Sequence, residues 1–139
     1  MIAVAWNRKT DIILIDTCAI IDVFKNDQNV LRSIHEWKDP VYISITTLGE
    51  LYYGALHSNN PDKHLGQIKD ILSTISILKP DTETAFQYAS TREALTKQGN
   101  LIPANDIWIA AIAIQHGLKL FTKDTHFERI ENLDLMLYC

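Results

Sequence analysis

Apolar and polar positions along the chain predict strands and helices in alternation. The first strong signal is the segment 11–15, which reads DIILI, and a continuous apolar run of this kind suits a strand covered on both faces. Further apolar or alternating runs predict strands at 41–45, 75–78, 118–122 and 133–137. We expect the run at 75–78, shortly before Pro80, at the edge of the sheet.

Between these runs, apolar residues recur at the spacing of a helix. They predict helices at 20–24, 30–37, 46–55, 65–75, 81–98 and 106–116. Gly99 and Gly117 follow the last two, where left-handed C-terminal caps belong. Strands that alternate with helices predict an α/β fold, a three-layer α/β/α sandwich with a mostly parallel central sheet.

Length and composition favour a single domain over residues 1–139, with a core at about 11–137. No apolar run reaches the roughly 18 residues of a membrane span, and the opening run 1–6 is too short for a signal peptide. Cys18 and Cys139 have no metal-ligand spacing, so we expect reduced thiols. These features predict a soluble cytoplasmic protein without a membrane partner.

The formal net charge of -4 argues at first sight against a nucleic-acid partner, because phosphate binding usually requires a basic excess. Setting four candidate site acids aside leaves 13 of the 17 Asp and Glu residues against 13 Lys and Arg. A divalent cation would neutralise part of the acidic remainder locally. The charge balance therefore permits RNA binding without arguing for it.

The four acids are predicted to meet at one edge of the sheet. Asp16 directly follows the first strand, and Asp124 lies just beyond Thr122 at the end of a later strand. We place Asp106 in the first turn of its helix, and Glu50 in the first turn of the helix after the second strand. Ligands of such folds bind at the carboxyl ends of the strands, so we expect a common site there.

Four carboxylates at one edge repel one another, at a cost of about 4 kcal/mol per close pair for an effective dielectric near 20. Either some of them bind protons or a hard divalent cation lies among them. Ligation by oxygen alone suits Mg²⁺ or Mn²⁺ rather than zinc. Such an ion can bind a phosphate oxygen and lower the pKa of a bound water.

Each acid also has a simpler interpretation on its own. Asp16 and Asp124 suit turns or helix caps, and Asp106 suits the start of a helix. Glu50 completes the pattern Thr47-x-x-Glu50, which is typical of a capping box. The shared location of the four acids, rather than any one of them, supports a site.

Three segments carry a resemblance to a known family: IILIDTCAII, VYISITTLGELYYGA and IPANDIWIAAIAIQHGLKLFTKDTHFERI. The third is the most specific, with an Asp-led helix, a small-residue face, a glycine, a strand and a Thr-x-Asp turn ahead of a Phe. Over nearly the whole chain the sequence resembles the PIN-domain ribonucleases, and more closely the VapC-like toxins of toxin–antitoxin pairs.

The resemblance implies that Asp16 and Asp106 are the principal metal ligands. It implies that Glu50 completes the acidic pocket and that Asp124 is a fourth catalytic residue, at a position where relatives carry Asp or Asn. Many relatives have a further Asp directly before the Phe, where this chain has His126. Asp124 would then substitute for that missing acid.

The resemblance further implies Mg²⁺- or Mn²⁺-dependent hydrolysis of RNA, a homodimer, and inhibition by a cognate antitoxin. Thr17 and Thr122 are candidates to orient carboxylates or waters. Lys123 and Arg129 are candidates to contact substrate phosphate or antitoxin carboxylate, although solvated surface is the commoner role for such residues.

Other classes of protein fit less well. A receiver domain would need adjacent acids near the first strand and a phosphoacceptor Asp after a middle strand, an arrangement this chain lacks. A haloacid-dehalogenase-type phosphatase would need Asp-x-Asp after the first strand, where Cys18 stands instead of the second Asp. A PIN-like binding module that partners a DNA-binding regulator, with weak or no nuclease activity, is the remaining alternative.

Overall fold

The structure, a computed structural model, describes residues 12–139. The opening run 1–6 and Asp11, the first residue of the predicted first strand, lie outside the described residues. Strands and helices alternate along most of the described chain, with these bounds: β1 Ile13–Ile15, α2 Thr17–Phe24, α3 Gln28–His35, β2 Val41–Ser44, α4 Ile45–Leu56, α5 Pro61–Leu72, β3 Ser76–Leu78, α6 Thr82–Gln98, α7 Ala104–His116, β4 Lys119–Thr122, the 3₁₀ helix η1 Thr125–Arg129, and β5 Asp134–Leu137.

The strands form one sheet in the order β3-β2-β1-β4-β5, and every neighbouring pair is parallel. The predicted parallel sheet is therefore confirmed, with β3 at an edge as expected. Strand β1 lies at the centre, where its three residues are almost fully buried. This position explains the unbroken apolar run, because a central strand meets apolar side chains on both faces.

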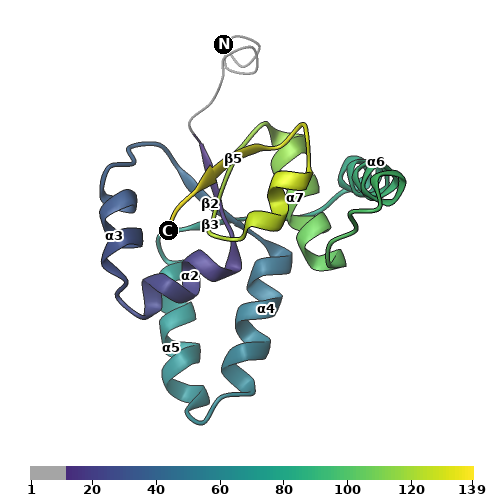
Figure 1. Cartoon of the computed structure of the whole chain (residues 1–139). Helices are drawn as coiled ribbons and strands as arrows, with labels where there is room; N and C mark the ends of the chain where they lie inside the picture. Colours follow the sequence, from purple (N-terminus) through teal and green to yellow (C-terminus); the bar gives the residue numbers. More distant parts are fainter. Residues whose placement is uncertain (1–11) are drawn as a thin grey trace.

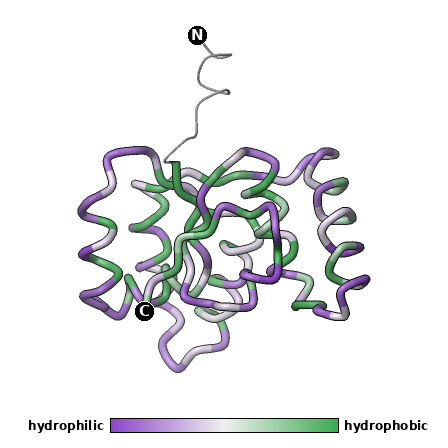
Figure 2. Tube along the Cα trace, turned by 45° about the horizontal axis from the view of Figure 1, so that its top comes forward, coloured by the Kyte–Doolittle hydropathy of each residue, from purple (hydrophilic) through white to green (hydrophobic). Residues whose placement is uncertain are grey.

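Helices cover both faces of the sheet, as the prediction of three layers requires. Leu14 and Leu120 point to the face packed by α6 and α7. Ile13, Ile15 and Phe121 point to the face packed by α2, α3, α4 and α5. Figure 1 shows α6 and α7 on one side of the strands, and Figure 2 shows apolar positions concentrated in the centre of the chain trace.

Several element boundaries differ from those predicted. The second strand ends at Ser44, and α4 begins at Ile45 because the Ser44 hydroxyl caps it by accepting a hydrogen bond from the Thr47 N–H. Glu50 consequently lies in the second turn of α4, and the predicted capping box between Thr47 and Glu50 is wrong. Helix α7 begins at Ala104, two residues before Asp106, which remains in its first turn.

The predicted left-handed caps are present at both glycines. Gly99 ends α6 with φ 69°, and Gly117 ends α7 with φ 66°. No helix within residues 12–139 combines the length and apolar character needed to cross a lipid bilayer.

Helix α7 presents a face of small residues to the sheet. Ala110, Ala111 and Ala113 are each fully buried, and the first and third of them belong to the same core cluster as Leu14 and Leu120. Because alanine adds little bulk, the helix axis lies close to the strands. Packing through this face positions the N-terminus of the helix, where Asp106 lies.

Overpacking this face tests the arrangement. We expect Ala113→Leu to lower the free energy of unfolding by about 1–3 kcal/mol, because the added carbons have no space in a close-packed core. Urea titration followed by circular dichroism measures it. The matched control Ala94→Leu, at an exposed position of α6, should stay within about 0.5 kcal/mol of the parent. Equal stability of the two variants would contradict this packing.

Candidate active site

Asp16 lies at the junction of β1 and α2 and is 4% exposed. Its backbone N–H donates to the Phe121 carbonyl at 3.0 Å, which ties it to the end of β4. Its carboxylate accepts hydrogen bonds from the Thr17 N–H at 2.8 Å and from the Thr122 hydroxyl at 2.7 Å. The Thr122 hydroxyl therefore orients this carboxylate, whereas Thr17 contacts it through its backbone N–H.

Asp106 and Asp124 converge on one imidazole. His126 Nε2 lies 2.6 Å from Asp106 Oδ2 and 3.0 Å from Asp124 Oδ2. Asp124 also caps η1, because its side chain accepts from the His126 N–H. Within residues 12–139, these three residues form a group whose potential ligand atoms all lie within 4.8 Å of one another.

The carboxylates of this edge influence one another. Burial raises the pKa of Asp106, the hydrogen bond from His126 lowers it in part, and the charges of Asp16 and Asp124 raise it further. Burial also raises the pKa of Asp16, against the hydrogen bonds from Thr122 and Thr17, with a smaller contribution from the charge of Asp124. Three of the four predicted acids thus share one electrostatic site.

Glu50 joins this site through Thr17. The Thr17 hydroxyl donates to Glu50 Oε1 at 2.8 Å, while the backbone N–H of the same residue binds Asp16. The Thr17 hydroxyl also lies 3.3 Å from the hydroxyl of Thr47. Glu50 therefore lies near Asp16, because the side chains of both accept hydrogen bonds from Thr17. It does not belong to the group formed by Asp106, Asp124 and His126.

Cys18 is also part of this edge, which sequence reasoning missed. Its thiol lies 3.5 Å from Asp16 Oδ2 and 3.4 Å from the Thr122 hydroxyl. Burial and the nearby Asp16 charge raise the pKa of the thiol. Both Cys18 and Cys139 are free, as expected. A protonated thiol at this position packs beside the carboxylate without adding negative charge.

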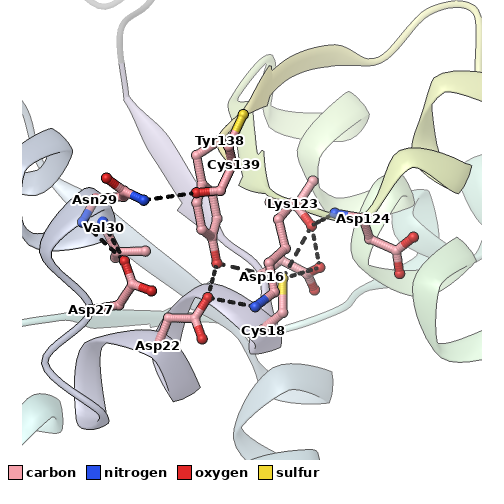
Figure 3. Close-up of polar contacts among 11 residues, drawn as sticks. Asp16, Cys18, Asp22, Asp27, Asn29, Val30, Lys123, Asp124, Tyr138 and Cys139 are labelled. Atoms are coloured by element: carbon pink, nitrogen blue, oxygen red, sulfur yellow. Dashed lines mark hydrogen bonds and ion pairs between the residues drawn. The ribbon is translucent and has the colours of Figure 1, made fainter.

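A second polar cluster supports the loop that carries Asp124 (Figure 3). Asp22, which is 6% exposed, accepts hydrogen bonds from Lys123 Nζ at 2.8 Å and from the Tyr138 hydroxyl at 2.7 Å. Burial alone would raise the pKa of Asp22, but these two hydrogen bonds and the Lys123 charge lower it overall. The cluster joins α2, the loop after β4 and the C-terminal segment.

Both basic candidates have hydrogen-bond partners within the chain. Lys123 is held by Asp22, although its side chain remains 48% exposed. Arg129 donates to the Leu101 carbonyl at 3.4 Å. The sequence analysis assigned no role to Asp22. The available signal was the presence of an acid within an otherwise apolar helical stretch, IIDVF.

The residues at this edge fit a divalent cation. Asp106 and Asp124 belong to the group of close ligand atoms, and Asp16 lies beside that group; all three supply carboxylate oxygens, the donors that hard cations take. Burial is the main cause of the raised pKa values of Asp16 and Asp106. His126 adds a nitrogen donor, which the sequence analysis did not include among the ligands. Its spacing in Asp124-x-His126 was the available signal.

An α/β/α sandwich with carboxylates at the carboxyl edge of a parallel sheet is the architecture of a PIN domain. Comparison with known families agrees, since residues 13–133 match the family described as PIN domain. The chain belongs to the PIN-domain family.

Curated relatives with similar sequences carry the name VapC. Ribonuclease VapC2 of Haemophilus influenzae is 35% identical over 119 residues, which are 84% of this chain and 90% of that protein. The tRNA(fMet)-specific endonuclease VapC of Shigella flexneri is 33% identical over 124 residues, which are 86% of this chain and 92% of that protein.

Solved structures give the same result. VapBC2 from Rickettsia felis, bound to a DNA fragment from its promoter, contains a chain with a TM-score of 0.86 and 26% identity, covering 91% of this chain and 98% of that one. DNA-bound VapBC from Salmonella typhimurium also gives 0.86, at 26% identity, covering 94% of this chain and all of that one.

The cluster around Asp22 predicts a particular pH dependence of stability. Because the pKa of Asp22 is lowered in the folded state, its contribution is complete above the ordinary value of 3.8 and is lost as the pH falls through the lower folded value. We expect Asp22→Asn to be less stable than the parent at neutral pH by about 1.5 kcal/mol, the low end for hydrogen bonds to a charged group, since Lys123 is half exposed.

Denaturant titrations from neutral pH down to about pH 2 would measure this difference, which should narrow below the ordinary Asp pKa. Asp39→Asn, an exposed carboxylate before β2, is the matched control and should show no such change. A difference that stays constant across this range would contradict the assigned role of Asp22.

Proposed function

We propose that this chain is a divalent-metal-dependent endoribonuclease that acts as the toxin of a toxin–antitoxin pair, with the whole chain as one PIN domain. The observation that supports it best is the convergence of Asp106 and Asp124 beside buried Asp16. Carboxylates that repel one another lower the stability of the fold. A divalent cation would relieve that repulsion and could also bind a phosphate group of the substrate. The names of the VapC relatives supply the substrate class.

Asp16 and Asp106 would hold the cation, with Asp124 next to them. When bound, a divalent ion lowers the pKa of a coordinated water and stabilises charge on the phosphate in an in-line displacement. Thr17 and Thr122 keep the Asp16 carboxylate in one orientation through the hydrogen bonds described above. Glu50 accepts a hydrogen bond from the Thr17 hydroxyl and would complete the acidic pocket.

The cognate antitoxin is the proposed protein partner, by similarity to the VapBC complexes. A groove of about 470 Å³ runs along α2, α4 and α5 and reaches Glu50. Its apolar lining suits an inserted segment of a partner: Ile21, Phe24, Leu51, Ala55 and Ile68. We also propose a homodimer in the cytoplasm.

The first test is RNA cleavage by the purified protein, free of any partner. We expect cleavage that depends on Mg²⁺ or Mn²⁺ and stops with a chelator. Asp16→Asn and Asp106→Asn should each reduce the rate by more than the roughly 10–100-fold typical of losing an outer-shell residue. Asp39→Asn, at an exposed position, should cleave like the parent.

Cleavage that persists in both variants would exclude the proposed site. A parent protein that cleaves no RNA at all would instead favour the PIN-like binding module that partners a DNA-binding regulator. Sequencing RNA ends from cells after induced expression would identify the RNA and the bond that is cut, because recognition of RNA by shape and loops leaves no short motif.

Removing the hydrogen bond to Asp16 tests the role of Thr122. We expect Thr122→Val, which has nearly the same shape but no hydroxyl, to weaken metal binding and RNA cleavage by about 10–100-fold, because Asp16 loses the donor that orients it. Titration calorimetry with Mn²⁺ and cleavage assays measure the two effects. Thr125→Val, at an exposed position of η1, is the control, and equal affinity of both variants would contradict this role.

A further inference from the structure

His126 is the one imidazole that contacts the acidic residues proposed as catalytic in the described chain. Its Nε2 atom faces Asp106 Oδ2 at 2.6 Å and Asp124 Oδ2 at 3.0 Å. The side chains of these three residues are 25%, 19% and 41% exposed, in the order His126, Asp106 and Asp124. The imidazole is therefore partly exposed and contacts both carboxylates.

The local backbone fixes this imidazole. Asp124 caps η1 by accepting from the His126 N–H at 3.2 Å, so the two side chains start from a single turn. The neighbouring Phe127 is fully buried, and the imidazole lies tilted against its ring with centroids 5.3 Å apart. Because the next residue is buried in the core, the backbone of His126 is held beside the carboxylates.

We propose that His126 is a ligand of the divalent ion through Nε2, together with Asp106 and Asp124, and that it makes the centre prefer a first-row transition ion such as Mn²⁺ over Mg²⁺. This inference rests on the proposed metal-dependent function. His126 adds a nitrogen donor to the carboxylates. It occupies the position directly before Phe127, where the family resemblance predicts an Asp.

The separations between the donor atoms support shared ligation. Two neighbouring ligands of an octahedral ion, each about 2.1 Å from it, lie about 3.0 Å apart. The Nε2 to oxygen distances of 2.6 and 3.0 Å are close to that separation. The three ligand atoms already lie within 4.8 Å of one another. An ion bound to Nε2 would take the place of the proton between Nε2 and the carboxylates, and that proton is released to solvent.

The chemistry of the donors predicts the preferred ion. Mg²⁺ takes oxygen ligands and retains waters, whereas imidazole nitrogen suits first-row transition ions. A site in which one imidazole joins the carboxylates therefore favours transition ions more than a site with carboxylates alone does. His126→Asp is the direct comparison, because it restores an acid at that position.

Pulsed electron paramagnetic resonance of the protein loaded with Mn²⁺ detects a coordinated nitrogen directly, without RNA. We expect nitrogen coupling in the parent and in the control His35→Gln, which removes an exposed histidine of α3. His126→Gln should lose the coupling. Calorimetric titration with each ion should show that His126→Asp lowers the preference for Mn²⁺ over Mg²⁺ by about 10-fold or more.

The outcomes separate this inference from the proposed function. Mn²⁺ bound by the parent without nitrogen coupling, or coupling that survives in His126→Gln, would overturn the role of His126 and leave a metal-dependent nuclease in place. A folded parent that binds neither ion would overturn both. Thermal unfolding of each variant checks that it is folded, and two different substitutions at this partly exposed position guard against the failure of either one.

Discussion

Repulsion between carboxylates at the carboxyl edge of the sheet is the constraint on which the rest of this site depends. Asp16 is almost completely buried, and Asp106 is influenced by the charges of both Asp16 and Asp124. Isolated negative charge in such surroundings is costly unless donors or a cation compensate it. The neighbouring polar groups meet this requirement, since Thr17 and Thr122 each donate a hydrogen bond to Asp16 and His126 Nε2 contacts Asp106.

The fold brings these carboxylates together at one edge of the sheet. Parallel pairing places the end of β1 beside the end of β4, with Ile15 opposite Phe121. The loops that leave these strands therefore carry Asp16 and Asp124 to the same edge. The small residues of α7 allow its N-terminus to approach, and Asp106 completes the group. Rearranging any of these packing contacts would move a carboxylate relative to the others.

Sequence patterns predicted the helices and strands more accurately than they predicted the side-chain contacts of the site. The apolar run of β1 and the glycines after α6 and α7 have local causes, so a local pattern reveals them. Glu50 finds its partner Thr17 across 33 residues, and His126 meets Asp106 across 20. Such pairs depend on how distant segments pack. Even the start of α4 was missed, because Ser44 rather than Thr47 caps the helix.

The charge balance of the chain also argues for a cation at this edge. Asp22 holds Lys123, and the Tyr138 hydroxyl contributes to the same carboxylate, so the basic residue next to Asp124 is already neutralised by a partner on α2. This pairing lets Lys123 anchor the loop but weakens it as a ligand for phosphate. With a formal net charge of -4, a bound divalent ion would reduce the repulsion between the chain and a phosphodiester. The cluster around Asp22 thus holds the loop that carries Asp124, and the acidic edge offers carboxylate oxygens of the kind that a hard cation takes.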